Sequence, residues 1–439
     1  MTPINDLSTQ PVAGGPVGLF GLRPGEWGPV AASFAMFFSV LSAYYIIRPV
    51  RDEMGVSLGK DALHHLFTVV FFVMLAAVPA FGAIASRFPR RTVLPLLYAF
   101  FIANLILFWA LFRSGASGDA LSATFFVWAS VFNLFVVSLF WSLMAELWSN
   151  EEAKRFYGLI SAGGTAGALA GPLLTRSLVS VLAPHDLLLV SGALLGAALS
   201  ASLVLRRIHP ASGLSDALPT GGGILDGAKK VMSSPYLGRI ALFILLANIV
   251  GTFFYLEQSR LVGLEIPDSA ERVKFFAGRD LATSLLTLTI EVFGTAAILR
   301  RFGVGAALLT LPAAALVSVL VLSVSSSLTV VAAVMVAERV LAFSLANPAI
   351  KVLYTLTAPD EKYKAQSFID TVVYRGGDAV SGWMFAAVSA GAGFATAATP
   401  ALALPLALAW IAVAKGLGGA HEQKARLAEQ TSAAKGAAP

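Results

Sequence analysis

Long apolar runs alternate with short polar or charged stretches from near the start of the chain to near its end. A helix needs about 20 apolar residues to cross a bilayer core about 30 Å thick. The pattern predicts twelve such helices, over residues 27–47, 63–85, 92–112, 121–146, 156–183, 187–206, 239–258, 281–299, 305–323, 328–357, 367–391 and 394–415. The fifth, tenth and eleventh spans are long, which indicates tilt or extension beyond the bilayer.

Basic residues favour one side of this predicted membrane bundle. They gather in the connections after even-numbered spans, whereas two connections after odd-numbered spans contain no Lys or Arg. The positive-inside rule therefore places the even connections and both termini in the cytoplasm. The seventh connection, residues 260–280, is an exception with four basic residues. Acidic residues accompany them, and we expect an external amphipathic segment there.

The longest interior connection, residues 209–237, is rich in Gly, Ser and Pro. It divides the chain into a flexible cytoplasmic tail (1–26), a six-helix half (27–208), a cytoplasmic linker (209–237), a second six-helix half (238–415) and a flexible cytoplasmic C-terminal tail (416–439). Two six-helix halves joined by a cytoplasmic linker are typical of the major facilitator architecture, in which the halves are pseudo-repeats. The predicted fold is therefore an all-α integral membrane protein with twelve transmembrane helices.

Composition supports the membrane class and excludes several others. Hydrophobic residues make up 57% of the chain and charged residues 13%, too few charges for an ordinary soluble protein. The absence of cysteine excludes disulfides, zinc–thiolate sites and a cysteine nucleophile. His64 and His65 are adjacent and cannot share one ligand, so we expect no metal site. The net charge of +6 reflects cytoplasmic loops rather than nucleic-acid binding.

Two connections carry similar sequences at equivalent places in the two halves. The first is GAIASRFPRR, residues 82–91, and the second is GTAAILRRFG, residues 294–303. Both resemble the major facilitator loop signature, in which small residues allow tight helix contact and arginines anchor the loop. In the first copy Ser86 replaces the usual Asp and Pro89 the usual Gly.

The fifth span has the glycine spacing of a closely packed helix. Its sequence, GLISAGGTAGALAGPLLTR, places Gly158, Gly167 and Gly171 before Pro172. This is similar to the fifth-span signature of major facilitator antiporters, although Thr175 and Arg176 replace the final Gly pair. General small-residue packing explains the same glycines equally well.

Ionisable and polar residues inside several spans lie on single helix faces. In the eighth span, Thr283, Thr287, Glu291 and Thr295 recur every four residues, which indicates either cavity lining or a structural acid. In the fourth span, Glu146 lies near the cytoplasmic end. At that position it can serve either in coupling or as an anchor for the loop. A carboxylate at such a position is expensive unless it has a partner or a function.

The seventh, tenth and eleventh spans show further polar stripes. The seventh contains Asn248, Thr252, Tyr255 and Ser259, and Tyr255 could stack on a ring or donate its hydroxyl. In the tenth, Arg339, Asn347 and Lys351 share a face, and we expect Glu338 to offset one of the basic charges. The eleventh carries Asp370, Tyr374 and Asp378 on one stripe. Arg375 either pairs with Asp378 along the helix or faces a bound solute.

Cations from several spans point to an anionic solute. They are Arg48, Arg51, Arg176, Arg339, Lys351 and Arg375. A cavity with several cations suits a small anion. At the end of the first span, Arg48, Arg51 and Asp52 share a face, and Pro49 can break the helix there. We therefore expect Arg51 and Asp52 to belong to the site and Glu53 and Met54 to form the exit towards solvent. The alternative is that this helix simply runs out into water.

Three stretches resemble one family. They are YYIIRPVRDEMG (44–55), NEEAKRFYGLISAGGTAG (150–167) and DEKYKAQSFIDTVVYRGGDAVSGW (360–383). They look like the ATP:ADP antiporter family, also called NTP/NDP exchange transporters, a branch of major-facilitator-like carriers. The resemblance implies exchange of adenine nucleotides without hydrolysis. It also implies a basic–acidic pair at Arg51 and Asp52, acids at Glu146 and Glu291, and a late cation at Lys351 or Arg375.

The sequence thus predicts a secondary transporter of the bacterial inner membrane that works by alternating access and exchanges an anionic phosphorylated solute such as ATP or ADP. Predicted substrate-binding residues are Arg48, Arg51, Asp52, Tyr255, Asn347, Lys351, Tyr374 and Arg375. Predicted coupling or charge-balancing residues are Glu146, Glu291 and Asp378. The alternative carrier is proton-coupled and moves another anionic metabolite, with Glu291 as its proton site. A membrane sensor without transport is a hypothesis of a different class, and the converging polar stripes disfavour it.

We expect no enzymatic activity, because the sequence contains no catalytic triad, paired-carboxylate hydrolase pattern or P-loop, and hence no cofactor. The expected partners are the nucleotide-like anion and the lipid bilayer, without nucleic acid, and the expected state is monomeric.

Overall fold

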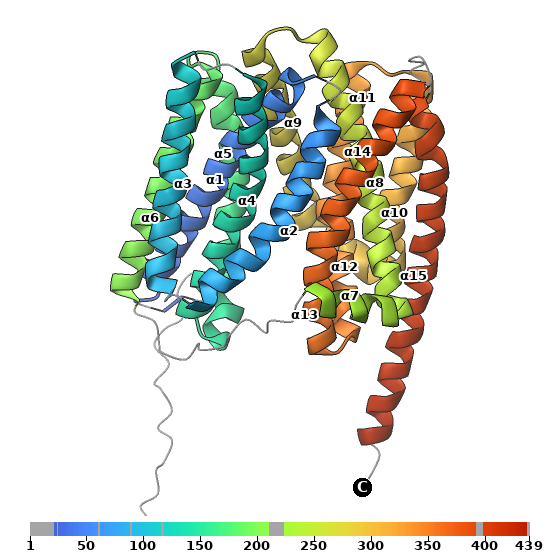
Figure 1. The fold of residues 1–439 in the computed structure, drawn as a ribbon. Helices are drawn as coiled ribbons and strands as arrows, with labels where there is room; N and C mark the ends of the chain where they lie inside the picture. Colours follow the sequence, from blue (N-terminus) through green and yellow to red (C-terminus); the bar gives the residue numbers. More distant parts are fainter. Residues whose placement is uncertain are drawn as a thin grey trace, which may run out of the picture.

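The computed structural model describes residues 22–23, 25–59, 62–87, 90–115, 118–209, 224–391 and 398–436. These residues form a bundle of long, roughly parallel helices without strands, and the chain divides into two groups of helices that stand side by side (Figure 1). We call the end of the bundle where α1 begins and α15 ends the terminal face, and the opposite end the distal face. The terminal face is at the bottom of Figure 1.

The N-terminal half contains the first six predicted spans. They are α1 (Trp27–Ser57), α2 (Leu63–Arg87), α3 (Arg90–Arg113), α4 (Asp119–Leu147), α5 (Asn150–Leu178) and α6 (Leu187–Ile208), with a 3-10 turn, η2 (Pro184–Asp186), before α6. Ser149 caps α5 through a capping box with Glu152, and this fixes where the fifth span begins.

The helices of the C-terminal half are interrupted more often. They are α8 (Pro235–Glu265), α9 (Ser269–Ile290), η3 (Glu291–Thr295), α10 (Ala296–Val324), α11 (Leu328–Leu341), η4 (Ala342–Ala346), α12 (Asn347–Leu353), η5 (Tyr354–Leu356), α13 (Pro359–Phe368), η6 (Ile369–Val373), α14 (Tyr374–Gly391) and α15 (Ala398–Gly436). The segments η3, η4 and η6 are π-helical turns inside the eighth, tenth and eleventh spans. Gly303, with φ of 79°, separates the eighth span from the ninth.

The twelve predicted spans are confirmed. Nine helical runs in the described part of the chain are long and apolar enough to cross a membrane by length and composition alone. One of these, Ser269–Val324, contains both the eighth and the ninth span, which are divided at Gly303. The fifth span, α5, and the eleventh span, α13 to α14, bring the total to twelve. Both contain glycines and charged residues, which lower their mean hydropathy.

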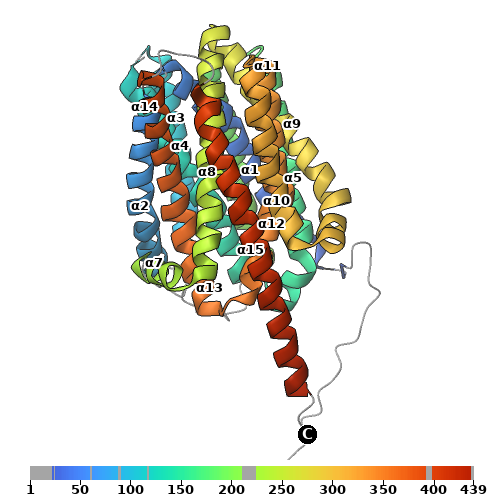
Figure 2. The ribbon, with the colours of Figure 1, turned by 90° about the vertical axis from the view of Figure 1, so that its right-hand side faces the viewer.

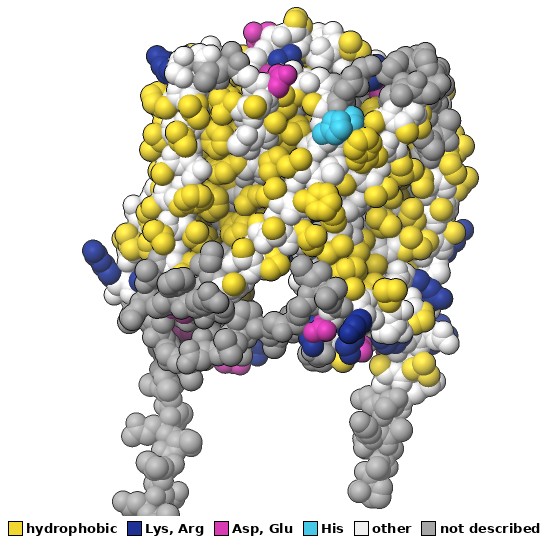
Figure 3. Space-filling view, in the orientation of Figure 1, with side chains coloured by type: hydrophobic (Ala, Val, Ile, Leu, Met, Phe, Trp, Pro, Cys, Tyr) yellow, Lys and Arg dark blue, Asp and Glu magenta, His cyan; other side chains and the backbone are white. Residues whose placement is uncertain are grey.

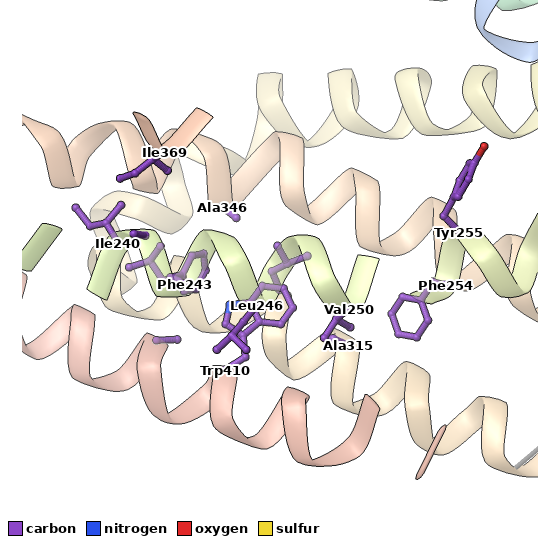
Figure 4. Packing of buried hydrophobic residues seen from close by; sticks show 14 of the residues in the cluster. Ile240, Phe243, Leu246, Val250, Phe254, Tyr255, Ala315, Ala346, Ile369 and Trp410 are labelled. Atoms are coloured by element: carbon purple, nitrogen blue, oxygen red, sulfur yellow. The ribbon is translucent and has the colours of Figure 1, made fainter. Parts of the chain in front are cut away.

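Two large apolar clusters are centred one on each half, and the one around α8 also takes in residues of α2 such as Leu66 and Met74. In the N-terminal half the core is rich in aromatic side chains, among them Phe125, Phe132 and Phe140, all essentially without exposure. In the C-terminal half the core follows α8, where Ile240, Phe243 and Val250 meet Trp410 of α15 and Ala315 of α10 (Figure 4). Figure 2 shows α15 running along the outside of this half and continuing beyond the other helices at the terminal face.

Glycines bring α5 directly against α1, as the glycine spacing predicts. A Cβ atom at Gly163 or Gly167 would collide with the carbonyl oxygen of Phe34 or Phe38, and one at Gly171 would lie 2.6 Å from Cβ of Tyr45. Gly158, which begins the predicted signature, has nothing within 4 Å of its Cβ position. The packing face is therefore Gly163, Gly167 and Gly171.

Three segments differ from the sequence-based expectations. The linker contains a short helix, α7 (Ile224–Ser233), and α15 continues as a helix to Gly436 through the predicted C-terminal tail. The predicted external segment at 260–280 is wrong as a separate element, because α8 extends to Glu265 and α9 begins at Ser269. Asp268 caps α9 by accepting a hydrogen bond from the Glu271 amide, so the helix starts three turns before the apolar run. In the first loop signature, the side chains of residues 84–92 lie outside the described part.

Candidate functional site

A group of charged side chains connects the two halves in the distal part of the bundle. It contains four arginines and two aspartates, and we call it the distal charge cluster: Arg48, Arg51 and Asp52 from α1, Arg279 and Asp280 from α9, and Arg339 from α11. The first three residues come from the N-terminal half and the others from the C-terminal half.

Arg279 is the centre of this cluster. Its Nη2 donates to Oδ2 of Asp52 and to Oδ1 of Asp280, both at 2.8 Å, and its Nη1 donates to Oε1 of Gln258 at 2.7 Å. Only 1% of the Arg279 side chain is exposed. A buried guanidinium with carboxylates on two sides is the arrangement that makes burial of a charge tolerable.

Asp52 is held from both halves. Arg51 donates to its Oδ1 at 2.7 Å, and the hydroxyl of Tyr255 donates to the same oxygen at 3.2 Å. Figure 4 shows Tyr255 at one end of the labelled α8 residues, with its hydroxyl directed away from Phe254 and Val250. Tyr255 therefore donates its hydroxyl, one of the two roles expected for it, and its ring also lies 5.9 Å from the ring of Phe67.

The alternative that the first span runs out into water is wrong, and so is the expectation that Glu53 lies at the exit towards solvent. Although Pro49 lies inside α1, the helix continues to Ser57, and Asp52 and Glu53 are buried. Glu53 accepts a bond from Nη2 of Arg272 at 2.8 Å, so it is a second ionic link between the halves rather than an exit towards solvent. Next to these charges, Val56 of α1 packs against Val262 of α8 and Phe276 of α9.

Positive charge exceeds negative charge in the distal charge cluster. Asp280 faces Arg48 at 3.4 Å and Arg339 at 3.8 Å, distances longer than those around Arg279. Nη1 of Arg339 and Oδ2 of Asp280 are both buried without a hydrogen-bond partner among the described residues. The side chains of Arg48, Arg51 and Arg339 are 11%, 17% and 16% exposed. These arginines can therefore still donate hydrogen bonds to an anion.

A second polar group joins α8 to α14. Asp378 accepts hydrogen bonds from Asn248 at 2.9 Å and Thr252 at 3.0 Å, and Arg375 approaches it at 3.4 Å. The intrahelical pairing that the sequence left open for Arg375 is thus present. The Arg375 guanidinium also lies 5.5 Å from the ring centroid of Tyr374 on the same helix.

The remaining predicted site residues lie elsewhere. Asn347 and Lys351 are exposed on α12, and Glu291 in η3 is within electrostatic range of Lys351. Asn347 and Lys351 follow η4 along the tenth span, and Glu291 is the first residue of η3. Glu146 is near the end of α4 and has one buried oxygen without a partner among the described residues. None of these four residues bonds to the distal charge cluster.

Sequence reasoning missed Arg279 and Asp280 because it ended the seventh connection at Asp280. Arg279 is 4% exposed and Asp280 is 1% exposed, less than any other charged residue described in the C-terminal half. The stripe Thr283, Thr287 and Glu291 extends one turn back to Asp280 at helical spacing, and that periodicity could have identified it. The expectation for Glu338 is also wrong: Arg339 approaches Asp280, and Glu338 pairs with no described cation.

The two halves are joined mainly in their distal part. Described bonds between them include Arg279 to Asp52, Arg272 to Glu53, and the indole of Trp383 to Thr68 at 3.0 Å. Towards the terminal face the space-filling view shows an opening between the halves (Figure 3). The distal charge cluster therefore lies at the closed end of the seam between the halves.

Comparisons with known proteins identify the family. The family described as Major Facilitator Superfamily matches residues 29–382. No curated protein matches the sequence of this chain closely enough to count as a relative.

Solved structures share the fold at low sequence identity. An auto-inhibited POT family peptide transporter has a TM-score of 0.64 and 16% identity, covering 88% of this chain and 96% of that one. The nucleoside transporter NupG has a TM-score of 0.61 and 14% identity, covering 90% and 98%. A bacterial homologue of the human lysosomal transporter Spinster, described as inward-facing and unoccupied, has a TM-score of 0.56 and 15% identity, covering 92% and 98%. With this fold and a family match over most of its length, the chain belongs to the Major Facilitator Superfamily and is a multi-pass membrane transporter.

Proposed function

We propose that this transporter exchanges a multiply charged anion, such as ATP for ADP, across the bacterial inner membrane by alternating access. The observation that carries the proposal is the charge imbalance of the distal charge cluster, in which four arginines face two aspartates. A dianionic group bound beside Arg48, Arg51 and Arg339 would balance the two excess charges.

The chemistry of these arginines suits phosphate or carboxylate oxygens. A guanidinium binds such groups through two parallel hydrogen bonds, and these bonds are strong where water is scarce. Tyr374, which is 43% exposed and lies near Arg48 and Arg375, offers a ring on which a base could stack. These features support a nucleotide, but they also suit any compact anion with two charges.

The position of the cluster suits a carrier that is open on one side. We place the terminal face in the cytoplasm, because the basic connections lie there. The distal seam is then closed towards the outside, and the opening in Figure 3 faces the cytoplasm. Two of the solved structures with this fold, the homologues of Spinster and of ferroportin, are described as inward-facing.

A proton-coupled carrier of another anionic metabolite is the second candidate. The observation that favours it is Glu338, an acid inside the tenth span that has no cationic partner among the described residues. Pure exchange does not need such a group, whereas proton coupling needs a carboxyl that can gain and lose a proton.

Counterflow in proteoliposomes tests the main proposal. Vesicles are preloaded with unlabelled ATP, ADP, inorganic phosphate, a dicarboxylate or neutral adenosine, and uptake of labelled ADP is followed. We expect transient ADP accumulation with nucleotides inside and none with adenosine. Arg339→Gln removes one of the excess charges and should slow exchange, whereas Lys154→Gln, at an exposed pair with Glu151, should not. Equal counterflow with adenosine, or accumulation of another anion instead of ADP, would exclude nucleotide exchange.

A further inference from the structure

Glu338 is an acid in the tenth span that the proposed anion site does not use. Its carboxylate packs against α8, where Oε1 would lie 3.2 Å from a Cβ atom placed on Gly251. No hydrogen bond or ion pair joins it to another described residue. The residue is partly exposed. A side chain at position 251 would press on the carboxylate and require it to move by a few tenths of an ångström.

The charged groups around Glu338 are engaged with other partners. On its own helix, Arg339 approaches Asp280 of α9, and Asp280 is bound by Arg279. On α14, Arg375 approaches Asp378, while Tyr374 is within electrostatic range of Glu338. On α8 the nearest group is Gly251, and Tyr255 one turn further is bonded to Asp52. On α10 the basic residues are Arg300 and Arg301, at its beginning near the terminal face.

A carboxylate without a counterion inside a bilayer costs several kcal/mol, and binding a proton removes that cost. The nearest described cations are directed towards aspartates, Arg339 at 3.8 Å from Asp280 and Arg375 at 3.4 Å from Asp378, and neither forms an ion pair with Glu338. The protonated and ionised forms of Glu338 therefore place different charge next to the distal charge cluster. With Glu338 protonated the excess of two positive charges is complete, and with Glu338 ionised it falls to one.

We infer that Glu338 is the proton-binding residue that couples anion movement to the proton gradient. Protonation raises the positive charge available to the anion, and by linkage a bound anion favours protonation. Proton and anion then cross together, as a symport. This inference rests on the proposed anion site, and it favours the proton-coupled mode over plain exchange.

Transport assays with Glu338→Gln test the coupling. The probe is labelled ADP, measured by counterflow without a gradient and by accumulation under an imposed inward proton gradient. Wild type should accumulate ADP under the gradient, and Glu338→Gln should lose this accumulation by about tenfold or more. Its counterflow should persist in some measure but no longer change with pH. Glu338→Asp, which keeps an acid, should restore part of the accumulation. The matched control is Asp370→Asn, which removes an acid from η6 in the eleventh span and should leave the gradient response in place.

A substrate-free measurement separates failure of this inference from failure of the anion proposal. Infrared difference spectra recorded during a pH titration show the carbonyl band of a protonated carboxyl. We expect a band that titrates in wild type and in Asp370→Asn, and that is missing in Glu338→Gln. If the band is unchanged in Glu338→Gln, or if that variant accumulates ADP like wild type, the inference is wrong even where counterflow succeeds. If ADP shows no counterflow but the band behaves as expected, the nucleotide proposal fails and proton binding at Glu338 stands.

Discussion

In the N-terminal half, α1 and α5 pack backbone against backbone, whereas in the C-terminal half α9 and α11 leave a cavity of about 1110 Å³ along one side. Both pairs border the seam between the halves. The first contact depends on Gly163, Gly167 and Gly171, and the second depends on side chains such as Ala333, Val336 and Leu286 that do not fill the space between the helices.

The same contrast appears in the helices themselves. In the C-terminal half η3 and η4 interrupt the eighth and tenth spans side by side, and Thr295 donates to the carbonyl of Ser344 at 2.7 Å across them. No π-turn interrupts the described helices of the N-terminal half. Because π-turns replace regular backbone bonds and often mark functional positions, the C-terminal helices are the ones that can bend there.

This difference explains how the two halves contribute to the distal charge cluster. The N-terminal half contributes residues from a single helix, α1, which α5 holds rigidly. The C-terminal half contributes Arg279, Asp280 and Arg339 from two helices that π-turns interrupt. Rocking of a rigid half against a bendable one could then break the cluster from the C-terminal side, with α1 as the fixed reference.

The largest expected effect is that of Asp52→Asn. This variant removes the carboxylate that joins the two halves in the distal charge cluster. Arg51 and Arg279 each lose a carboxylate, and breaking a buried ion pair in this way costs about 3–5 kcal/mol. The midpoint of thermal unfolding in detergent should fall clearly. Asp119→Asn, at the exposed start of α4, is the control and should leave it unchanged.

The same variant should also loosen the distal seam. Because the chain has no cysteine, a single Cys can report on it, and Val56→Cys is suitable because Val56 packs against Gly263 across the seam. We expect faster thiol labelling in the Asp52→Asn background than in the Asp119→Asn background. Equal labelling rates would mean that the distal charge cluster does not hold the halves together.

The second effect concerns the rigid helix pair. Gly167→Leu places a side chain where the backbone of α1 lies, and overpacking of this kind costs about 1–3 kcal/mol. Gly158→Leu on the same helix meets nothing within 4 Å and should be tolerated. The measurement is the fraction of folded, monodisperse protein after heating. If both leucines are tolerated alike, α1 and α5 are not in backbone contact and the N-terminal half is not the rigid one.

The third effect tests the bendable pair. Thr295→Val removes the hydroxyl that links η3 to η4 and should cost about 1 kcal/mol of stability. Thr289→Val is the control, because Thr289 bonds only to Leu285 within its own helix. We expect the two variants to differ in transport rate more than in stability, because only Thr295 joins the two π-turns. Identical transport rates would show that this link has no part in the conformational cycle.

The sequence predicted much of the fold because hydropathy and glycine spacing are local. Twelve spans, two halves and the tight fifth span follow from runs of 20 residues or from residues four apart. The interruptions at η3, η4 and η6 could not be predicted in this way. The turns η3 and η4 are joined by the bond between Thr295 and Ser344, and these two residues are far apart in the sequence.

The candidate site was predicted only in part, for a related reason. Arg48, Arg51, Asp52 and Tyr255 stood out as polar residues at helix ends, and the structure does bring them together. Their partner Arg279 was assigned to a loop, because a hydropathy window ends where charges begin. Whether a charge at such a boundary is buried depends on the opposite half of the protein, which no local window includes.

The smallest expected effect comes from filling the cavity beside α9 and α11. Ala333 is exposed on α11 and lines this cavity, so Ala333→Leu should change the free energy of unfolding by no more than about 0.5 kcal/mol. Ala349→Leu on α12 is the matched comparison, because Ala349 is fully buried and the added atoms should cost about 1–3 kcal/mol. Thermal unfolding of the two variants in the same detergent separates them. If Ala333→Leu is as costly as Gly167→Leu, then α9 and α11 pack as closely as α1 and α5. The two halves would then border the seam with equal rigidity, and the asymmetry would have to come from the π-turns alone.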